Sequence, residues 1–219
     1  MVLLIPFSNE IEALLGIAIL LSALYMQGQS FVDPTIRAIL LQSLLLSSLF
    51  VILAIQSGNI DLFYLAVLTI IMRGITVPRI MLYQVRKLKH SLRETGAGQR
   101  IPTFILLAIG LVIVGYALFK TILEPYIQNT QVSVSFILLL LGFLLIISRR
   151  NSLVQMTGYI EEENAILYAG ALIVPSIPLL IEFAVVLDIF GVVIIGVILS
   201  AERDIFHTLE PADLEQLSG

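Results

Sequence analysis

The chain has 219 residues, of which 58% are hydrophobic and only 13% are charged, and its formal net charge at pH 7 is −4. Soluble domains carry about a quarter charged residues, so this composition, with a mean hydropathy of +1.03, indicates a polytopic membrane protein and excludes an ordinary soluble domain. The sequence contains no cysteine, which excludes disulfides, thiolate metal sites, iron–sulfur clusters and cysteine nucleophiles, and its two histidines do not favour a haem or zinc site built from this chain alone.

Seven segments are long and apolar enough to span a membrane as helices, which takes about 20 residues each. We therefore expect an all-α protein with about seven transmembrane helices, at residues 10–27, 35–56, 61–83, 101–122, 132–148, 151–173 and 177–200. The connections are short except for the basic segment 84–100. The N-terminus lacks the basic region and cleavage site of a signal peptide, so we expect it to be retained.

The basic residues indicate the orientation of these helices. With seven spans, ten of them fall on one side of the membrane: Arg37, Arg79, Arg86, Lys87, Lys89, Arg93, Arg100, Arg149, Arg150 and Arg203. The opposite side has only Lys120. Since Lys and Arg favour the cytoplasmic side, we expect a multi-pass protein of the cell (inner, cytoplasmic) membrane with its N-terminus outside and its acidic C-terminus in the cytoplasm.

Arg73 is the first charged residue expected near the middle of the membrane, where a charge costs about 2.5–3.5 kcal/mol on insertion scales and marks a functional candidate. It lies midway along the third span, and Pro78 cannot donate a hydrogen bond to the carbonyl of Gly74. The sequence predicts a kinked, polar spot where Arg73 acts as an electrostatic modulator, with a static ion pair that fixes helix packing as the alternative. Gln42, in the second span, is interpreted as a packing residue, with a hydrogen bond across helices as the alternative.

Three consecutive glutamates, Glu161, Glu162 and Glu163, lie in the sixth span, with Glu163 roughly 18 Å deep at 1.5 Å per residue. Successive helical residues point about 100° apart, so we expect at least one glutamate to face a neighbouring subunit or a water-filled cavity. Three adjacent carboxylates in a low-dielectric environment cannot all stay ionised. The run is therefore a candidate site for taking up and releasing protons, unless it is shallower than expected and merely solvated.

Asp188, about eleven residues into the seventh span, is a further candidate for the proton path. Ala184 and Gly191 share its helix face, so close packing there would bury the acid against protein rather than lipid. The alternative is a hydrogen bond that serves packing only. Glu182, near the outer end of the same span, is a secondary candidate that is equally compatible with reaching the interface.

Motifs of self-contained enzymes are absent from the sequence, which has no HExxH zinc motif, no phosphate-binding glycine loop and no nucleophile elbow. No lysine lies midway along a span, which excludes a retinal Schiff base. The residues alone thus indicate a membrane subunit that handles protons or other ions.

The stretch ISRRNSLVQMTGYIEEENAIL (147–167) resembles the K subunit of bacterial respiratory complex I and, equally, the C subunit of multisubunit cation/proton antiporters. Those are three-helix proteins that would match residues 132–200. Nearly the whole chain resembles component E of the hydrogenase-4 group, which includes membrane-bound hydrogenases and formate hydrogenlyases. The shared features are Gln42 with serine in the second span, Arg73 with Val77 and Pro78, RRN at 149–151, GY at 158–159, an acid before Asn164, and an aspartate in the last span.

By this resemblance the family's acid in the sixth span corresponds to Glu163, and the second buried glutamate of the K subunit falls about one position from Asp188. The first buried glutamate of the K subunit would match Ile160, so Glu161 is displaced by one residue and the working glutamate stays open. Arg73 replaces a residue that is often lysine, and arginine stays charged at any relevant pH.

The resemblance implies an integral, non-catalytic subunit of a hydrogenase-4-like or complex-I-like oxidoreductase. The subunit would line part of a proton path and connect hydrophilic redox subunits with antiporter-like and quinone-site-like membrane subunits. We expect no cofactor in this chain and no nucleic-acid partner, with nickel–iron and iron–sulfur centres in partner subunits. Alternatives are a subunit of a cation/proton antiporter without a redox partner, or a structural spacer. The expected organisation is three helices with the basic loop (1–100), the fourth helix with an outer loop (101–131), the K-like unit (132–200) and the tail (201–219).

Overall fold

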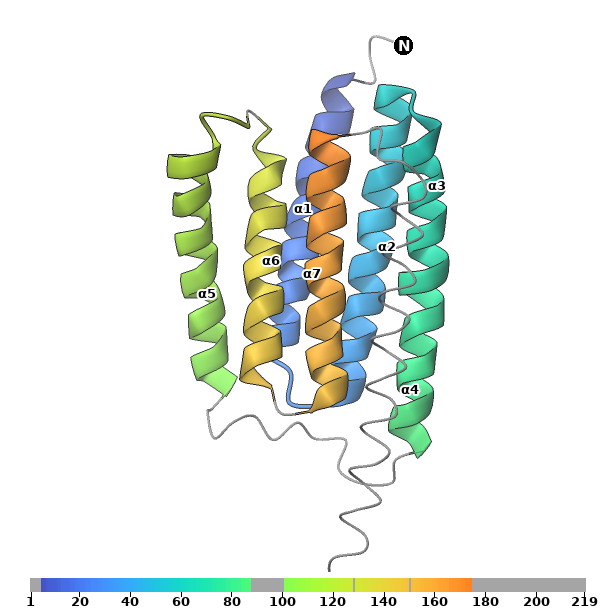
Figure 1. Cartoon of the computed structure of the whole chain (residues 1–219), viewed down its shortest axis with the longest axis vertical. Coiled ribbons are helices and arrows are strands. Elements are labelled where there is room, and N and C mark those ends of the chain that lie inside the picture. Colours follow the sequence, from blue (N-terminus) through green and yellow to red (C-terminus); the bar gives the residue numbers. More distant parts are fainter. Residues whose placement is uncertain (1–4, 88–100, 128, 150, 175–219) are drawn as a thin grey trace, which may run out of the picture.

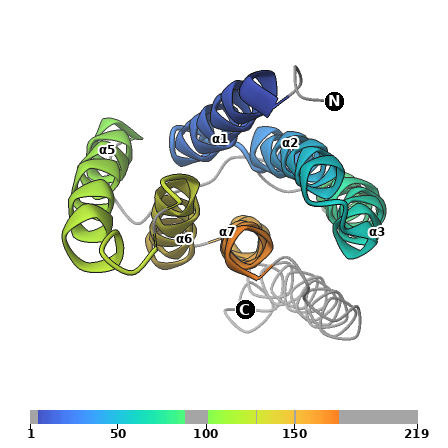
Figure 2. The same ribbon diagram turned by 90° about the horizontal axis from the view of Figure 1, so that it is seen from above.

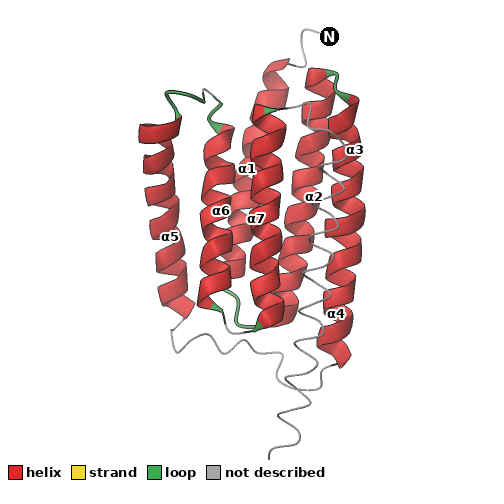
Figure 3. Cartoon of the chain, in the orientation of Figure 1, coloured by secondary structure: helices red, strands yellow, loops and turns green. Residues whose placement is uncertain are grey.

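The computed structural model describes residues 5–87, 101–127, 129–149 and 151–174, and these residues form helices and short turns without a β-strand (Figures 1 and 3). The helices are α1 (Ile5–Gln27), α2 (Val32–Ser57), α3 (Ile60–Thr69), η1 (Ile70–Thr76), α4 (Val77–Lys87), α5 (Ile101–Leu118), η2 (Phe119–Leu123), α6 (Gln131–Ser148) and α7 (Ser152–Ile173). The segments α3, η1 and α4 follow one another without a break and form one long rod. The expected all-α class is confirmed.

The helices lie where the spans were expected. Five of the described helices are long and apolar enough to cross a membrane: Glu10–Gln27, Val32–Ser57, Ile60–Tyr83, Ile101–Leu123 and Gln131–Ser148. Helix α7 has 22 residues, and its three glutamates set it apart from these five in composition. The expected seventh span, with Glu182 and Asp188, lies outside the described residues. The chain is a multi-pass membrane protein.

The rods run side by side and alternate in direction, which gives the bundle two ends (Figure 1). The upper end of Figure 1 holds the start of α1, the turn between α2 and α3, the loop before α6 and the end of α7. At this end Gly58 closes α2 in a left-handed conformation (φ 66°), which glycine adopts without a steric penalty. The side chain of Asn59 then caps α3 by accepting a hydrogen bond from the backbone N–H of Asp61. The lower end holds the α1–α2 and α6–α7 connections and the end of α4.

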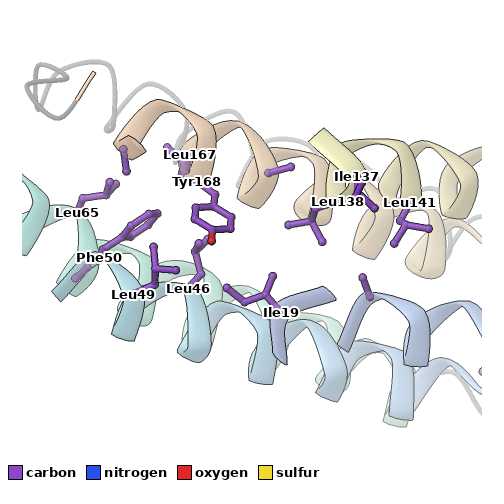
Figure 4. Packing of buried hydrophobic residues seen from close by; sticks show 14 of the residues in the cluster. Ile19, Leu46, Leu49, Phe50, Leu65, Ile137, Leu138, Leu141, Leu167 and Tyr168 are labelled. Carbon is purple, nitrogen blue, oxygen red and sulfur yellow. The ribbon is translucent and has the colours of Figure 1, made fainter. Parts of the chain in front are cut away.

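Seen from above, α6 and α7 lie beside the row formed by α1, α2 and α3, and α5 lies at the far side of α6 (Figure 2). Side chains from all these helices meet in one buried apolar cluster, part of which is drawn in Figure 4: Ile19, Leu46, Leu49, Phe50, Leu65, Ala108, Ile137, Leu138, Leu141, Leu167 and Tyr168. A second cluster nearer the lower end joins Met26, Ile36, Ile39, Val77, Met81, Leu145, Leu153 and Ile160. Both clusters contain residues from before and after position 132, so the helices expected to form a K-like unit pack together with the helices before them.

Helices α6 and α7 approach each other closely at two glycines. A Cβ atom on Gly142 would lie 2.7 Å from Cγ of Glu162 and 2.9 Å from the carbonyl oxygen of Gly158. A Cβ atom on Gly158 would lie 2.9 Å from the carbonyl oxygen of Gly142. In a membrane, helix association depends on van der Waals packing, and small residues let the backbones approach. The two glycines therefore bring Glu162 against α6.

The rod that carries Arg73 changes its winding just before Pro78. Residues Ile70–Thr76 form a π-helical segment, and the backbone N–H of Val77 donates to the carbonyl of Met72, five residues earlier. The hydroxyl of Thr76 donates to the carbonyl of Ile71 (2.7 Å). A proline lacks the N–H that a regular helix needs, and π-helical turns are frequent at functional sites. Where the sequence predicted a kink, the structure therefore has a wide helical turn around Arg73.

Candidate functional site

Arg73 is buried, with 1% of its surface exposed, and its guanidinium group reaches from η1 to the middle of α7. The Nη1 group donates a hydrogen bond to Oδ1 of Asn164 (3.0 Å). The Nη2 group lies 3.5 Å from Oε2 of Glu163, which makes a buried ion pair. Residues about 90 positions apart in the sequence are thus brought together, and one of the acids predicted for the proton path contacts the predicted electrostatic modulator.

Asn164 extends this contact to a third helix. Its Nδ2 group donates to Oε1 of Gln42 in α2 (3.0 Å) and lies 3.5 Å from the hydroxyl oxygen of Ser43. We call these five residues, Gln42, Ser43, Arg73, Glu163 and Asn164, the Arg73 network. Gln42 therefore makes a hydrogen bond across helices, the second of its two interpretations. The network joins α2, η1 and α7 through polar side chains whose buried atoms need such partners.

The three glutamates occupy positions ten to twelve of the 22 residues of α7, so the run lies in the middle of the helix. The side chain of Glu163 is 12% exposed and faces Arg73. Glu162 is 9% exposed and packs against Gly142. Glu161 is 0% exposed, and neither of its carboxylate oxygens accepts a hydrogen bond from a described residue. The three side chains fan out as predicted, and all of them are largely covered by other parts of this chain. The expected contact with a neighbouring subunit or a water-filled cavity stays a prediction.

One face of α7 carries polar side chains from the glutamate run toward the upper end. Glu161, Asn164, Tyr168 and Ala171 follow each other at intervals of three and four residues, the spacing that places residues on one helix face. All four are buried. The hydroxyl of Tyr168 donates to Oε1 of Gln131 at the start of α6 (3.0 Å). Tyr168 was not singled out from the sequence, because a tyrosine on an apolar helix also fits ordinary packing.

Glu12 is a buried acid that the sequence reasoning missed. It lies in α1 with 8% of its surface exposed and accepts a hydrogen bond from the side chain of Gln56 in α2. The signal in the sequence was weak, because Glu12 falls near the start of an expected span, where acids are often solvated.

Arg149, the first arginine of the RRN motif, is buried at the lower end with 4% exposure. Its Nη1 and Nη2 groups donate to the backbone carbonyls of Gln29 (3.0 Å) and Gln27 (2.6 Å). Its guanidinium carbon lies 4.8 Å from the centre of the Phe104 ring, within the range of a cation–π contact. From the sequence, Arg149 indicated only the orientation and the family resemblance, whereas in the structure it connects the α1–α2 turn and α5 to the end of α6.

Two of the predicted path residues, Asp188 and Glu182, lie outside the described residues. Within the described ranges, no group of three or more His, Asp or Glu side chains is arranged to hold a metal ion. The expectation of a chain without its own cofactor stays an expectation.

Comparison with known proteins identifies relatives that match most of the chain. No family model and no solved structure matches it. Hydrogenase-4 component E of Escherichia coli (strain K12) is 27% identical over 180 residues, which cover 81% of this chain and 82% of that protein. Component E of Shigella flexneri matches equally well. An uncharacterized protein of Mycobacterium tuberculosis is 23% identical over 185 residues, or 83% of each chain. The similarity to hydrogenase-4 component E that the sequence motifs indicated is therefore confirmed over most of the chain.

Proposed function

We propose that this chain is an integral membrane subunit of a hydrogenase-4-like, complex-I-like oxidoreductase and contributes buried acids to proton translocation. The observation that carries the proposal is the Arg73 network, which pairs Glu163 with a permanent positive charge in the middle of an apolar helix bundle. Charged groups at this depth are costly and mark ion pathways. The similarity to hydrogenase-4 component E supports the class of complex.

In this proposal Glu163 and Glu161 have different roles. Arg73 stays charged at any relevant pH, so it stabilises Glu163 when that carboxylate is ionised. Asn164 holds the guanidinium group in place, because its Oδ1 accepts from Arg73 while its Nδ2 donates to Gln42. Glu161, two residues away on α7, has no such stabilising contact among the described residues and is the carboxyl that takes up a proton.

The redox chemistry belongs to other subunits, which hold the nickel–iron and iron–sulfur centres. A charge change there alters the balance between protonated and ionised acids in this chain, and Asp188, with Glu162 and Glu182 as secondary sites, continues the path. The subunit connects the redox module with antiporter-like and quinone-site-like subunits. In the cell membrane, its lower end with Arg37, Arg86 and Arg149 faces the cytoplasm.

Substitutions of the acids in the purified complex, reconstituted in liposomes, test this function. In Glu163→Gln, Glu161→Gln and Asp188→Asn we expect proton translocation per electron pair to fall several-fold while the complex still assembles, because each change removes one protonatable group and keeps the side-chain size. Glu124→Gln is the matched control, since Glu124 is exposed at the upper end. Unchanged translocation in all three variants would contradict the proposal.

Two other functions are separated by simple measurements. An antiporter subunit would co-purify in mild detergent with antiporter-like subunits only, whereas the proposed function requires polypeptides that carry nickel–iron or iron–sulfur centres. A structural spacer is favoured by one observation, namely that the Arg73 network bridges three helices. For a spacer, Glu163→Gln would lower the thermal stability of the complex and leave translocation per assembled complex unchanged.

A further inference from the structure

A pocket of about 370 Å³ lies at the upper end of the bundle, beside the buried acid Glu12. It is partly open and is lined by Glu12, Leu53, Gln56, Ser57, Leu62, Asn129, Ala171 and Leu172. These residues come from α1, α2, α3, the loop before α6 and the last turn of α7. Several described elements therefore contribute polar side chains to the pocket, and water has room to enter it.

Apart from Glu12 itself, the described residues that line this pocket are uncharged. The side chain of Gln56 donates a hydrogen bond to its carboxylate, and Ser57 and Asn129 line the same pocket. The hydroxyl of Tyr168 in α7 lies beside Gly16, one turn along α1 from Glu12. The pocket lining has no lysine or arginine, so this acid, unlike Glu163, lacks a positive partner there.

Tyr168 lies between this pocket and the glutamate run. A Cβ atom on Gly16, one turn from Glu12 in α1, would lie 3.0 Å from the Tyr168 hydroxyl and 2.7 Å from Oε1 of Gln131. The two polar groups therefore lie close against the backbone of α1 at Gly16. Figure 4 shows the Tyr168 ring reaching from α7 into the space between α7 and the helices of Ile19 and Leu46.

The polar face of α7 connects the two regions. Ala171 lines the pocket, Tyr168 and Asn164 follow, and Glu161 is ten residues away along the helix, or about 15 Å at 1.5 Å per residue. A tyrosine hydroxyl both donates and accepts hydrogen bonds. On the proposed path it accepts a proton from the Glu12 side and releases its own proton to a water molecule on the Glu161 side, so one O–H bond forms on its oxygen as the other breaks.

We infer that Glu12 is the carboxyl at which this chain exchanges protons with water at the upper end of the bundle, and that Tyr168 connects it to Glu161. The inference rests on the proposed function and adds the site at which the proton path meets water at the upper end of the bundle. In the exchange step a hydronium ion in the pocket gives its proton to the Glu12 carboxylate and becomes water. The reverse step returns the proton to the pocket.

The test uses the whole complex in liposomes, with proton translocation per electron pair as the readout. We expect Glu12→Gln to lower translocation several-fold and Tyr168→Phe to lower it by a smaller factor. Glu10→Gln is the matched control, because Glu10 lies two residues away and is exposed. Glu161→Gln and Glu163→Gln are measured in parallel. If these two lower translocation and Glu12→Gln does not, the inference is overturned and the proposed function stands. If Glu12→Gln, Glu161→Gln, Glu163→Gln and Asp188→Asn all leave it unchanged, both fail.

A second measurement does not depend on the assembly of a variant. A hydrophobic carbodiimide reacts with protonated carboxyl groups in apolar surroundings, and peptide mass spectrometry locates the adduct in the wild-type complex. We expect an adduct on Glu12 and a loss of translocation that follows its yield. An adduct without a loss of translocation, or the absence of an adduct, overturns the inference. So does a Glu12→Gln complex that assembles poorly but translocates normally per assembled unit, since Glu12 would then serve only its hydrogen bond to Gln56.

Discussion

Two buried arginines, Arg73 in the middle of the bundle and Arg149 at its lower end, have partners of different kinds. The comparison shows that the partners of a buried charge determine whether its contacts depend on protonation. Arg73 contacts a carboxylate and a side-chain amide on α7. The described contacts of Arg149 go to two backbone carbonyls and an aromatic ring. Both side chains have nearly the same exposure, 1% and 4%. Burial alone therefore does not distinguish a charge paired with a carboxylate from a charge bound to backbone carbonyls.

The partners differ in whether they can change. A backbone carbonyl does not titrate, so the contacts of Arg149 with Gln27 and Gln29 do not depend on the protonation of their acceptors. A carboxyl group, unlike a backbone carbonyl, can carry a proton, so the strength of a contact such as that of Glu163 with Arg73 depends on its protonation state. The first arrangement suits a fixed joint between helices, and the second suits a site that responds to charge.

The largest expected effect comes from removing the charge of Arg73. Arg73→Met leaves Glu163 buried without its ion-pair partner, and breaking a buried pair in this way costs about 3–5 kcal/mol. The free energy of unfolding of the full chain in detergent, measured by denaturant titration, checks this. In the double variant Arg73→Met/Glu163→Gln we expect part of the loss to be regained, with a coupling energy of about 1–3 kcal/mol. Strictly additive losses would show that the ion pair contributes no stability.

A somewhat smaller effect is expected at Arg149. Arg149→Met removes two hydrogen bonds from a charged donor, each with a net contribution of about 1.5–3 kcal/mol. Because both come from one guanidinium group at the end of the bundle, we expect a loss near the lower limit of their sum, about 3 kcal/mol, in the same titration. Arg37→Met is the control, because Arg37 pairs with Asp33 at the exposed start of α2 and such pairs contribute at most about 1 kcal/mol.

The Arg149→Met substitution also tests whether the two arginine sites are independent. Arg149 follows the last residue of α6, whereas Glu163 lies in the middle of α7, so Arg149→Met combined with Glu163→Gln is expected to be additive within about 0.5 kcal/mol. A large coupling would mean that the two arginine sites form one unit, and the distinction between a fixed and a responsive charge would be lost.

The smallest expected effect is at Gly142, where α6 and α7 pack closely against each other. Gly142→Ala places a methyl group against the backbone of Gly158 and Glu162, and overpacking of this kind costs about 1–3 kcal/mol. Gly110→Ala in α5 is the matched control, because a methyl group there meets nothing within 4 Å, and replacing a helical glycine by alanine stabilises by about 0.5–1 kcal/mol. Equal effects of both substitutions on the melting temperature in detergent would contradict the close contact.

The positions of the helices could be predicted from the sequence because the signal is local: an apolar run of about 20 residues crosses a bilayer as an α-helix. Arg73 and Glu163 could each be identified by the same logic, since a charge in such a run is conspicuous. Their pairing could not, because it depends on how rods far apart in the sequence pack together. The partners of Arg149 are backbone carbonyls, which every residue has, so no residue type could reveal them. Glu12 was missed because its depth depends on what covers the start of α1.

The wide turn before Pro78 has a consequence for the lower part of the rod. Buried side chains recur there at every fourth residue, at Thr69, Arg73, Val77, Met81 and Val85. In a regular α-helix each step of four residues overshoots a full revolution by about 40°, and four steps would carry the stripe nearly to the opposite side. The π-helical segment Ile70–Thr76 rotates by a smaller angle per residue than an α-helix, which compensates for much of this rotation of the stripe. Deleting a single amino acid from that stretch would roll Val77, Met81 and Val85 out of register with the rest of the protein.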